Sequence, residues 1–401
     1  MPIEVEPGVA AWLLVGFNEN LTVLRNPALF ARDPRIWREI VEGRMTPSSP
    51  LWPIFGYRPN LLSADGPEHQ RLRAPLTDAM AKINLPKLVN DVRDVCDGLI
   101  DRFIADGTAD LIEQYAIWVP ILALNRLFGR DDRDGFMLVE MSRAIWTSDE
   151  NTANAANEQI AGYFAELVAQ KRREPGEDLP SWMIHHPSAL NDEEVVHGLI
   201  QTALGNSDPT THLIGNTLLA LLSDRDFRAA SARSGELVEE AINRVLWSDP
   251  PIPILPARYA RADTEIGGVP IRAGEGVIMG LAASHGDPIL GGSDQLARST
   301  KVNRAYLSWG AGPHRCPCED TARTIVTTGI SQLLRRVPTL RLAASADQFQ
   351  WRPSQFIRGL VDLPVQFTPD SPRPVAPVPD QTDSAQRRGW WARLGARFTG
   401  R

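Results

Sequence analysis

The sequence predicts a mainly α-helical fold with a small β portion. Apolar residues recur at helical spacing in several long segments, whereas the alternation typical of strands is confined to two short ones. The chain has 401 residues, of which 43% are hydrophobic, so it can bury one large core or two modest ones. The predicted helices are 86–106, 151–172, 191–224, 235–247 and 319–337, and the predicted strand segments are 264–281 and 359–367.

Local signals locate the ends of several of these elements. Asn191 followed three residues later by Glu194 forms the pattern of a capping box, which predicts the start of the third helix. A Gly-Gly pair between alternating apolar positions predicts a turn between two strands within 264–281. The segment 359–367 is expected to form another short strand pair. The last helix carries one apolar stripe and ends at Pro338, which cannot continue it.

Composition excludes several classes of function. The formal net charge is −7, so no overall basic field favours nucleic acid, and we expect no nucleic-acid partner. No apolar stretch approaches the roughly 18 residues that a membrane span requires. Nothing at the N-terminus resembles a signal peptide, and three cysteines cannot form a disulfide framework. These features predict a reducing, cytoplasmic setting, in which cysteines serve as core residues, metal ligands or nucleophiles.

The chain divides into three parts by composition. Residues 1–368 are expected to form one folded domain, and 369–386 are proline-rich and polar, as in an extended linker. The tail, 387–401, carries five arginines and no acidic residue, and its apolar residues would share one helical face. Two interpretations stay open for it: a disordered segment, or a basic amphipathic segment that docks on an acidic partner or a membrane surface.

Cys316 stands in a rigid turn directly before the helix 319–337. Backbone N–H groups and the helix dipole favour a thiolate at such a position. Gly310 and Gly312 let the backbone fold tightly, and two prolines stiffen the turn. A thiolate held open by a rigid loop suits a soft metal centre. An inert buried cysteine would not need this scaffold, and a Cys-x-Cys zinc site with Cys318 lacks a second ligand pair at suitable spacing.

The segment WGAGPHRC, 309–316, resembles the haem-binding loop of the cytochrome P450 superfamily. Trp309 stands where that family usually has phenylalanine, and Cys318 where it has glycine or alanine. The resemblance extends over about residues 10–368 and implies a haem-thiolate catalytic domain there. In that fold, haem b lies between the long central helix and the helix after the cysteine loop. The resemblance further implies that Cys316 is the axial thiolate of the haem iron.

The same resemblance implies contacts to the two haem propionates. The segment 64–76 looks like a family helix with His69 and Arg73 one turn apart, and 255–268 looks like the strand that carries a propionate-binding arginine, here Arg258. Buried carboxylates need compensating donors of this kind. The implied haem-binding residues are His69, Arg73, Arg258, Trp309, Gly310, Gly312 and His314.

The central helix departs from the family at its oxygen-binding groove. The family pattern A/G-G-x-D/E-T-T falls on 205–210, where the acid is kept as Asp208 but the alcohol is replaced by Pro209. Proline lacks an N–H and its ring clashes with the preceding turn, so we expect a kink there. Asn206 or Ser207 could instead hold a water, at lower acidity. The residues implied in catalysis are Asn206, Ser207, Asp208 and Pro209.

Two further departures concern the support of the haem loop. The family's E-x-x-R pair falls on Arg244 and Trp247, so neither residue matches, and we expect Glu240 to pair with Arg244 one helical turn away. The indole of Trp309 either donates a hydrogen bond to the cysteine sulfur or packs as phenylalanine would.

The resemblance also implies where a substrate binds. In this chain the walls of the family's pocket would be mainly apolar and aromatic with a few amides, which suits a flat aromatic substrate that forms hydrogen bonds. For each residue, ordinary core packing is the alternative. The implied lining is Met45, Leu51, Trp52, Phe55, Ala203, Ile254, Leu255, Gln355, Phe356 and Ile357, together with Asn206 and Ser207.

Loss of the alcohol favours a haem-thiolate oxidase of secondary metabolism that removes hydrogen atoms from its substrate without inserting oxygen. The resemblance points to oxidative C–C or C–N coupling of a tryptophan-containing cyclodipeptide (a diketopiperazine). The alternatives are a hydroxylating monooxygenase acting on a polyketide, terpenoid or peptide, and a non-catalytic recruitment domain. Electrons are expected from NAD(P)H through a ferredoxin reductase and a ferredoxin, whose acidic surface would dock on basic residues such as Arg315 and Arg323.

Overall fold

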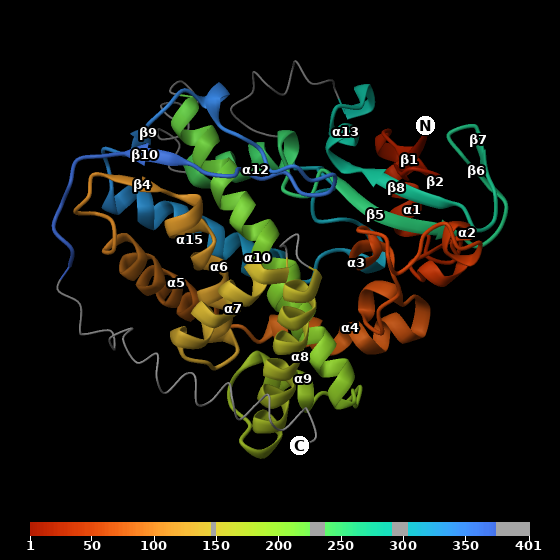
Figure 1. The fold of residues 1–401 in the computed structure, drawn as a ribbon, viewed down its shortest axis with the longest axis horizontal. Coiled ribbons are helices and arrows are strands. Elements are labelled where there is room, and N and C mark those ends of the chain that lie inside the picture. The colour runs from red at the N-terminus through yellow and green to blue at the C-terminus, as the bar shows by residue number, and fades with distance from the viewer. Residues whose placement is uncertain (146–149, 225–236, 291–303, 374–401) are drawn as a thin grey trace.

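The computed structural model describes residues 1–145, 150–224, 237–290 and 304–373 (Figure 1). In these ranges helices predominate and the strands form three small sheets, so the predicted fold class is confirmed. None of the helices found there is both long and apolar enough to cross a membrane. Beyond Arg373, the rest of the predicted linker and the whole predicted tail lie outside the described residues.

The predicted helices are all present in the structure. The start of the longest is capped as expected, because the Asn191 side chain accepts from the backbone N–H of Glu194 and the Glu194 carboxylate accepts from that of Asn191, both at 2.9 Å. The helices are α1 (Phe17–Arg25), α2 (Arg38–Val41), α3 (Trp52–Phe55), α4 (Gly66–Ala81), α5 (Leu85–Ile100), α6 (Trp118–Leu127), α7 (Asp132–Ile145), α8 (Glu150–Arg173), α9 (Leu179–Ile184), α10 (Asp192–Ser223), α12 (Leu237–Ser248), α13 (Leu281–His285) and α15 (Glu319–Arg336).

The strands form sheets with the orders β1-β2-β8-β5-β3, β4-β10-β9 and β6-β7. β2 and β8 pair in parallel, with Trp12 opposite Val277, and the other neighbours are antiparallel. The strands are β1 (Pro2–Glu6), β2 (Val9–Leu14), β3 (Phe30–Ala31), β4 (Thr108–Asp110), β5 (Ile254–Ala260), β6 (Thr264–Ile266), β7 (Val269–Ile271), β8 (Gly276–Gly280), β9 (Arg341–Leu342) and β10 (Pro364–Gln366).

The two strand predictions have different outcomes. The Gly-Gly turn lies between β6 and β7, and Gly267 and Gly268 have φ of 56° and 77°, which glycine adopts without strain. The prediction of a strand pair within 359–367 is wrong. Only β10 forms there, and its partners β4 and β9 come from other parts of the chain, while Leu360 forms an isolated bridge with Trp351.

The helix α10 passes through the middle of the helical part of the molecule (Figure 1). From Thr210 to Leu218 every one of its residues is buried, because α6, α8, α12 and α15 all pack against it. Its polar side chains therefore find partners on other elements. Asn216 donates to the carbonyls of Asp249, at 3.2 Å, and Arg358, at 3.0 Å, which holds the chain around 351–360 against the helix.

The first residues of the predicted linker still contact the folded domain. The backbone N–H of Asp370 donates to the carbonyl of Ile104 at 3.1 Å. Arg373 donates from its backbone to Asp101 at 3.1 Å and from its guanidinium to Asp97 at 2.6 Å. The chain thus lies along α5 and the turn after it up to Arg373, and the domain boundary at 368 stays a prediction.

Replacing Gly359 by alanine should destabilise the protein. The added Cβ would lie 1.9 Å from a ring nitrogen of His212 on α10, so the chain around 351–360 would have to move away from the helix. Overpacking of this kind costs roughly 1–3 kcal/mol of unfolding free energy. We expect a lower midpoint in thermal unfolding followed by far-UV circular dichroism.

Gly98→Ala in α5 is the matched control for this variant. Its Cβ would have no atom within 4 Å, and alanine favours a helix interior over glycine by about 1 kcal/mol. We expect a neutral or higher unfolding midpoint, and an equal loss of stability in both variants would contradict the packing argument.

Candidate active site

The loop that carries Cys316 is tightly folded and anchored from both sides. The backbone N–H of Gly310 donates to Leu307 at 2.7 Å, and that of Cys316 donates to Trp309 at 2.8 Å. Gly310 and Gly312 have φ of 71° and 67°, and a Cβ on Gly312 would lie 2.3 Å from a backbone oxygen of α1. Only glycine fits there. Cys316 is therefore fixed just ahead of the first turn of α15.

Hydrogen bonds stabilise the ionised form of this cysteine. The side chain and the backbone of Cys318 both hydrogen-bond the Cys316 sulfur and lower the pKa of Cys316, although burial opposes the shift. The hydrogen bond to Cys316, together with burial, raises the pKa of Cys318 well above its usual value, so it remains a thiol. Cys318, whose position the family usually gives to glycine or alanine, thus supplies a donor that the sequence analysis missed.

Four basic side chains gather beside the loop from three separate segments. His69 and Arg73 come from α4, Arg258 from β5 and His314 from the loop itself. The rings of His69 and His314 lie 3.9 Å apart between centroids, and the Arg73 guanidinium donates to the carbonyl of Arg315 at 2.5 Å. Residues from three separate sequence motifs thus come together in one cluster beside the loop.

The described chain neutralises this basic cluster only in part: the Asp65 carboxylate lies 3.5 Å from His314 Nε2, but no ion pair joins His69, Arg73 or Arg258 to an acidic group among the described residues. Arg258 is only 2% exposed, and its printed hydrogen bond is a long one, 3.4 Å, to the carbonyl of Ala257. Burial and the charge of Arg73 lower the pKa of His69 to about 4, and burial lowers the pKa of His314 to about 3 although Asp65 opposes this. Among the described groups, His69 Nε2 and His314 Nδ1 are buried without a hydrogen-bond partner.

The site therefore fits a haem. A thiolate sulfur is one of the axial ligands that haem iron takes in proteins. The unpaired ring nitrogens and the buried guanidinium of Arg258 are the groups that two carboxylates would satisfy. Cys316 would hold the iron, and His69, Arg73, Arg258 and His314 would hold the propionates.

On α10, the predicted acid belongs to a cluster of three side chains. Asp208 accepts from the guanidinium of Arg352 at 3.0 Å and lies 3.3 Å from His212 Nε2, which itself lies 2.7 Å from Arg352. Burial alone would raise the pKa of Asp208, but the hydrogen bond from His212 and the charge of Arg352 hold it below its usual value. The sequence analysis missed His212 and Arg352, although His212 lies four residues after Asp208, on the same helix face.

The other predicted catalytic residues of α10 have their donors occupied. Ser207 Oγ donates to the carbonyl of Ala203 at 2.5 Å. Asn206 Nδ2 donates to the carbonyl of Thr202 at 2.8 Å and to Cys318 Sγ at 3.5 Å. Pro209 lies inside α10, which is one continuous helix from Asp192 to Ser223, and the kink expected at Pro209 stays a prediction.

Comparisons with known proteins identify similar chains. No protein-family model matches the chain. It is 29% identical over 368 residues to cytochrome P450 107B1 of Saccharopolyspora erythraea, and the matched segment covers 90% of each chain. It is also 29% identical over 377 residues to the vitamin D(3) 25-hydroxylase of Pseudonocardia autotrophica, 91% of this chain and 90% of the relative. Among solved structures, the cytochrome P450 CxnD, an enzyme for C–S bond formation in chuangxinmycin biosynthesis, superposes with a TM-score of 0.80 at 26% identity, covering 92% of this chain and 91% of that one.

The chain is a cytochrome P450. It belongs to the bacterial branch of this superfamily, and its activity is that of an oxidoreductase. Haem is its cofactor, and electrons reach it from NAD(P)H through a ferredoxin reductase and a ferredoxin.

Most of the predicted substrate residues of this P450 gather in one aromatic cluster. Met45, Phe55 and Phe356 are buried there, with the rings of Phe55 and Phe356 5.7 Å apart between centroids. Leu51, Trp52 and Ile254 pack against them. Four predicted residues lie elsewhere. Leu255 packs against the apolar cluster that α1 forms with β2, β5 and β8, and Ala203 lies in the main helical core. Gln355 donates to the carbonyl of Val5 at 3.5 Å, and Ile357 is half-buried.

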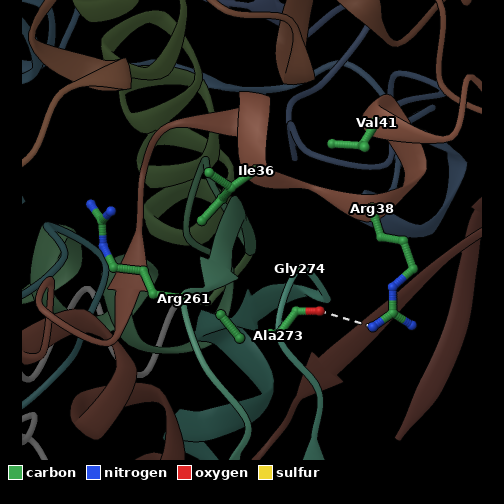
Figure 2. A pocket seen from close by; sticks show the side chains of 7 residues that line it. Ile36, Arg38, Val41, Arg261, Ala273 and Gly274 are labelled. Carbon is green, nitrogen blue, oxygen red and sulfur yellow. Dashed lines mark hydrogen bonds between the residues drawn. The ribbon is translucent and has the colours of Figure 1, made fainter.

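Two surface clefts of the P450 lie away from these residues. One, of about 400 Å³, lies beside the end of β5, where Arg38 donates to the carbonyl of Ala273 at 2.8 Å (Figure 2). The other, of about 180 Å³, lies between the starts of α4 and α10. All the predicted substrate residues are in the described part of the chain, and none of them lines either cleft.

Two predictions about the surroundings of the haem loop need correction, and a third is decided between its two alternatives. Glu240 pairs with Arg304 at 3.0 Å and Arg244 with Asp224 at 2.9 Å, instead of with each other. The indole N–H of Trp309 has no hydrogen-bond partner among the described residues and the ring packs against the main core, as the alternative of phenylalanine-like packing expects. The side chain of Arg323, expected on a ferredoxin-docking surface, is only 19% exposed and is bound by Glu239, Asn243 and Tyr306.

Arg315 remains available for docking of a redox partner. Its side chain is 60% exposed and lies 2.6 Å from Glu319. The docking of a ferredoxin on Arg315 therefore stays a prediction, consistent with the exposure of the guanidinium.

Replacing Arg258 by glutamine should have opposite effects with and without haem. The buried Arg258 charge forms no ion pair with a carboxylate among the described residues, so its removal should raise the unfolding midpoint of the haem-free protein. Haem should dissociate about 10–100-fold faster, because a charge-assisted hydrogen bond is lost. The transfer of haem to apomyoglobin measures this rate. Arg272→Gln, at an exposed pair with Asp263, should change neither quantity, and a stable, haem-retaining Arg258→Gln protein would contradict the assignment.

Proposed function

We propose that this P450 is a haem-thiolate oxidase of secondary metabolism that joins two atoms of an aromatic substrate without inserting oxygen. A tryptophan-containing cyclodipeptide is the substrate to test first, for C–C or C–N coupling. We place the enzyme in the cytoplasm, with ferredoxin and its reductase as partners. When bound, the haem supplies dioxygen activation and one-electron oxidation.

The lack of a free proton donor at positions 206–209 of α10, where the family has its acid and alcohol, is the observation that carries this proposal. Pro209 has neither a hydroxyl nor an N–H, and the Ser207 hydroxyl proton is committed to the carbonyl of Ala203. Both N–H groups of the Asn206 amide are also committed. A substrate with N–H groups of its own, as a cyclodipeptide has in its lactam and indole rings, can donate protons in their place.

Asp208 supports the same interpretation. Because Arg352 and His212 hold its pKa below the usual value, the carboxylate is ionised at neutral pH. It can accept a proton, but it carries none to donate. This cluster therefore suits a reaction in which the substrate loses hydrogen, and it does not by itself supply the protons that oxygen insertion needs from the protein.

The proposed reaction balances without an oxygen atom in the product. Joining two atoms that each carry a hydrogen removes two hydrogen atoms from the substrate. Together with two electrons from the ferredoxin and two protons, these reduce one dioxygen to two waters. C–S bond formation by CxnD, a structural neighbour at 26% identity, supports this class of outcome.

Hydroxylation is the second candidate, favoured by the vitamin D(3) 25-hydroxylase among the relatives. It would require an ordered water that draws its protons from elsewhere than Asn206 and Ser207. A non-catalytic recruitment domain is disfavoured, because the buried charge of Arg258 and the unpaired ring nitrogens of the two histidines would then never meet an anion.

Turnover under ¹⁸O-labelled dioxygen tests the proposal directly. With an indole cyclodipeptide, ferredoxin, its reductase and NAD(P)H, we expect products that have lost two hydrogen atoms and contain no label by mass spectrometry. A hydroxylated product that carries one labelled oxygen would show that the enzyme is a monooxygenase.

Pro209→Thr should shift the product ratio towards oxygenation. It restores a hydroxyl at the position where the family has its alcohol, and a positioned proton donor contributes about 10²–10⁴-fold to a rate, so we expect at least about a tenfold rise in oxygenated by-products. Pro209→Ala is the control, because it restores the N–H without a hydroxyl. The same ratio in all three proteins would mean that Pro209 is purely structural.

A further inference from the structure

The chain that leads into the Cys316 loop is held by residues other than the two that form the E-x-x-R pair in the family. Counted back from Pro251, the two positions of that pair hold Arg244 and Trp247, which cannot form an ion pair, whereas the buried Glu240 of α12 pairs with Arg304, in the chain that leads into the loop, at 3.0 Å. Trp247 instead stacks on His285 of α13, with centroids 5.2 Å apart and planes inclined by 28°. The support of the loop must therefore come from other contacts.

His285 links the end of α12 to the loop through both of its ring nitrogens. Nδ1 donates to the carbonyl of Trp247 at 2.9 Å, and Nε2 accepts from the backbone N–H of Leu307 at 2.8 Å. The ring is 1% exposed, so water does not compete for either bond. Because one nitrogen donates and the other accepts, the imidazole is neutral and in a single tautomer.

A second set of contacts joins α12, the loop and α15 at one oxygen atom. Asn243 Oδ1 accepts from the Tyr306 hydroxyl at 2.9 Å and from the Arg323 guanidinium at 2.7 Å. Arg323 also donates to the Tyr306 hydroxyl oxygen, and to Glu239 on α12 at 3.1 Å. These residues lie on three different segments, so the network fixes the segments relative to one another.

We propose that these contacts form a loop brace, which positions Cys316 in this P450 in place of the missing E-x-x-R pair. The loop brace consists of Asn243, His285, Tyr306 and Arg323. Its members hold Leu307 and the chain next to it, and the backbone of Leu307 and Trp309 in turn accepts from Gly310 and Cys316. A shift at Leu307 is thereby transmitted to the sulfur through two backbone hydrogen bonds.

The test follows the thiolate-type red-shifted Soret band of the reduced, carbon monoxide-bound holoenzyme over time. Tyr306→Phe removes the hydroxyl, and Asn243→Leu removes the shared acceptor. In both variants we expect the band to convert to the form without the thiolate shift about fivefold faster or more than in the wild type, with unchanged helix content by circular dichroism. Asn243→Asp keeps the acceptor oxygen and should keep the wild-type rate.

Tyr115→Phe is the matched control. The Tyr115 hydroxyl is also buried and donates to the carbonyl of Gly329 in α15 at 2.7 Å, but it does not contact the loop. The variant should lower the unfolding midpoint without speeding band conversion. The proposal is overturned if Tyr306→Phe and Asn243→Leu keep the band as long as the wild type, or if Tyr115→Phe loses it as fast as they do.

Discussion

The site depends on one electrostatic constraint: charges that are buried next to the Cys316 loop are stable only when they meet opposite charges or hydrogen-bond partners. The chain satisfies the sulfur itself, through Cys318 and the start of α15. On the other side, the buried Arg258 guanidinium forms no ion pair with a described residue, and the ring atoms His69 Nε2 and His314 Nδ1 have no hydrogen-bond partner there, although Asp65 lies 3.5 Å from His314 Nε2. A dianionic haem resolves both demands at once, so binding of the cofactor and stability of the loop are linked.

In our proposal, proton supply distinguishes coupling of a substrate from its hydroxylation. A hydroxylase needs donors next to α10, whereas an enzyme that only joins atoms of its substrate can take protons from the substrate. In this chain the donors of Asn206 and Ser207 are turned to backbone carbonyls and a thiol, and Asp208 is held in its ionised form. The aromatic cluster around Phe55 and Phe356 adds an apolar wall, consistent with a flat substrate.

Motifs with fixed spacing were predictable from the sequence, and contacts between distant segments were not. The glycines and prolines around Cys316 indicate its special position, and the apolar periodicity predicts the long helices. The parallel pairing of Trp12 with Val277 has no local signal, and neither has the contact of Arg352 with α10, because in each case the partners meet only through the fold. The predicted Glu240–Arg244 pair failed for the same reason, since a distant arginine competes for the carboxylate. The family comparison located the site, but the brace that supports it required the coordinates.

The absorbance of the reduced, carbon monoxide-bound protein, compared between wild type and Cys316→Ser, tests the central claim most directly. Our account predicts a Soret band with the red shift typical of a thiolate ligand in the wild type and its complete loss in the variant, whose serine oxygen cannot replace the sulfur. A red-shifted band that survives in Cys316→Ser would contradict the assignment of the iron ligand and the site built around it.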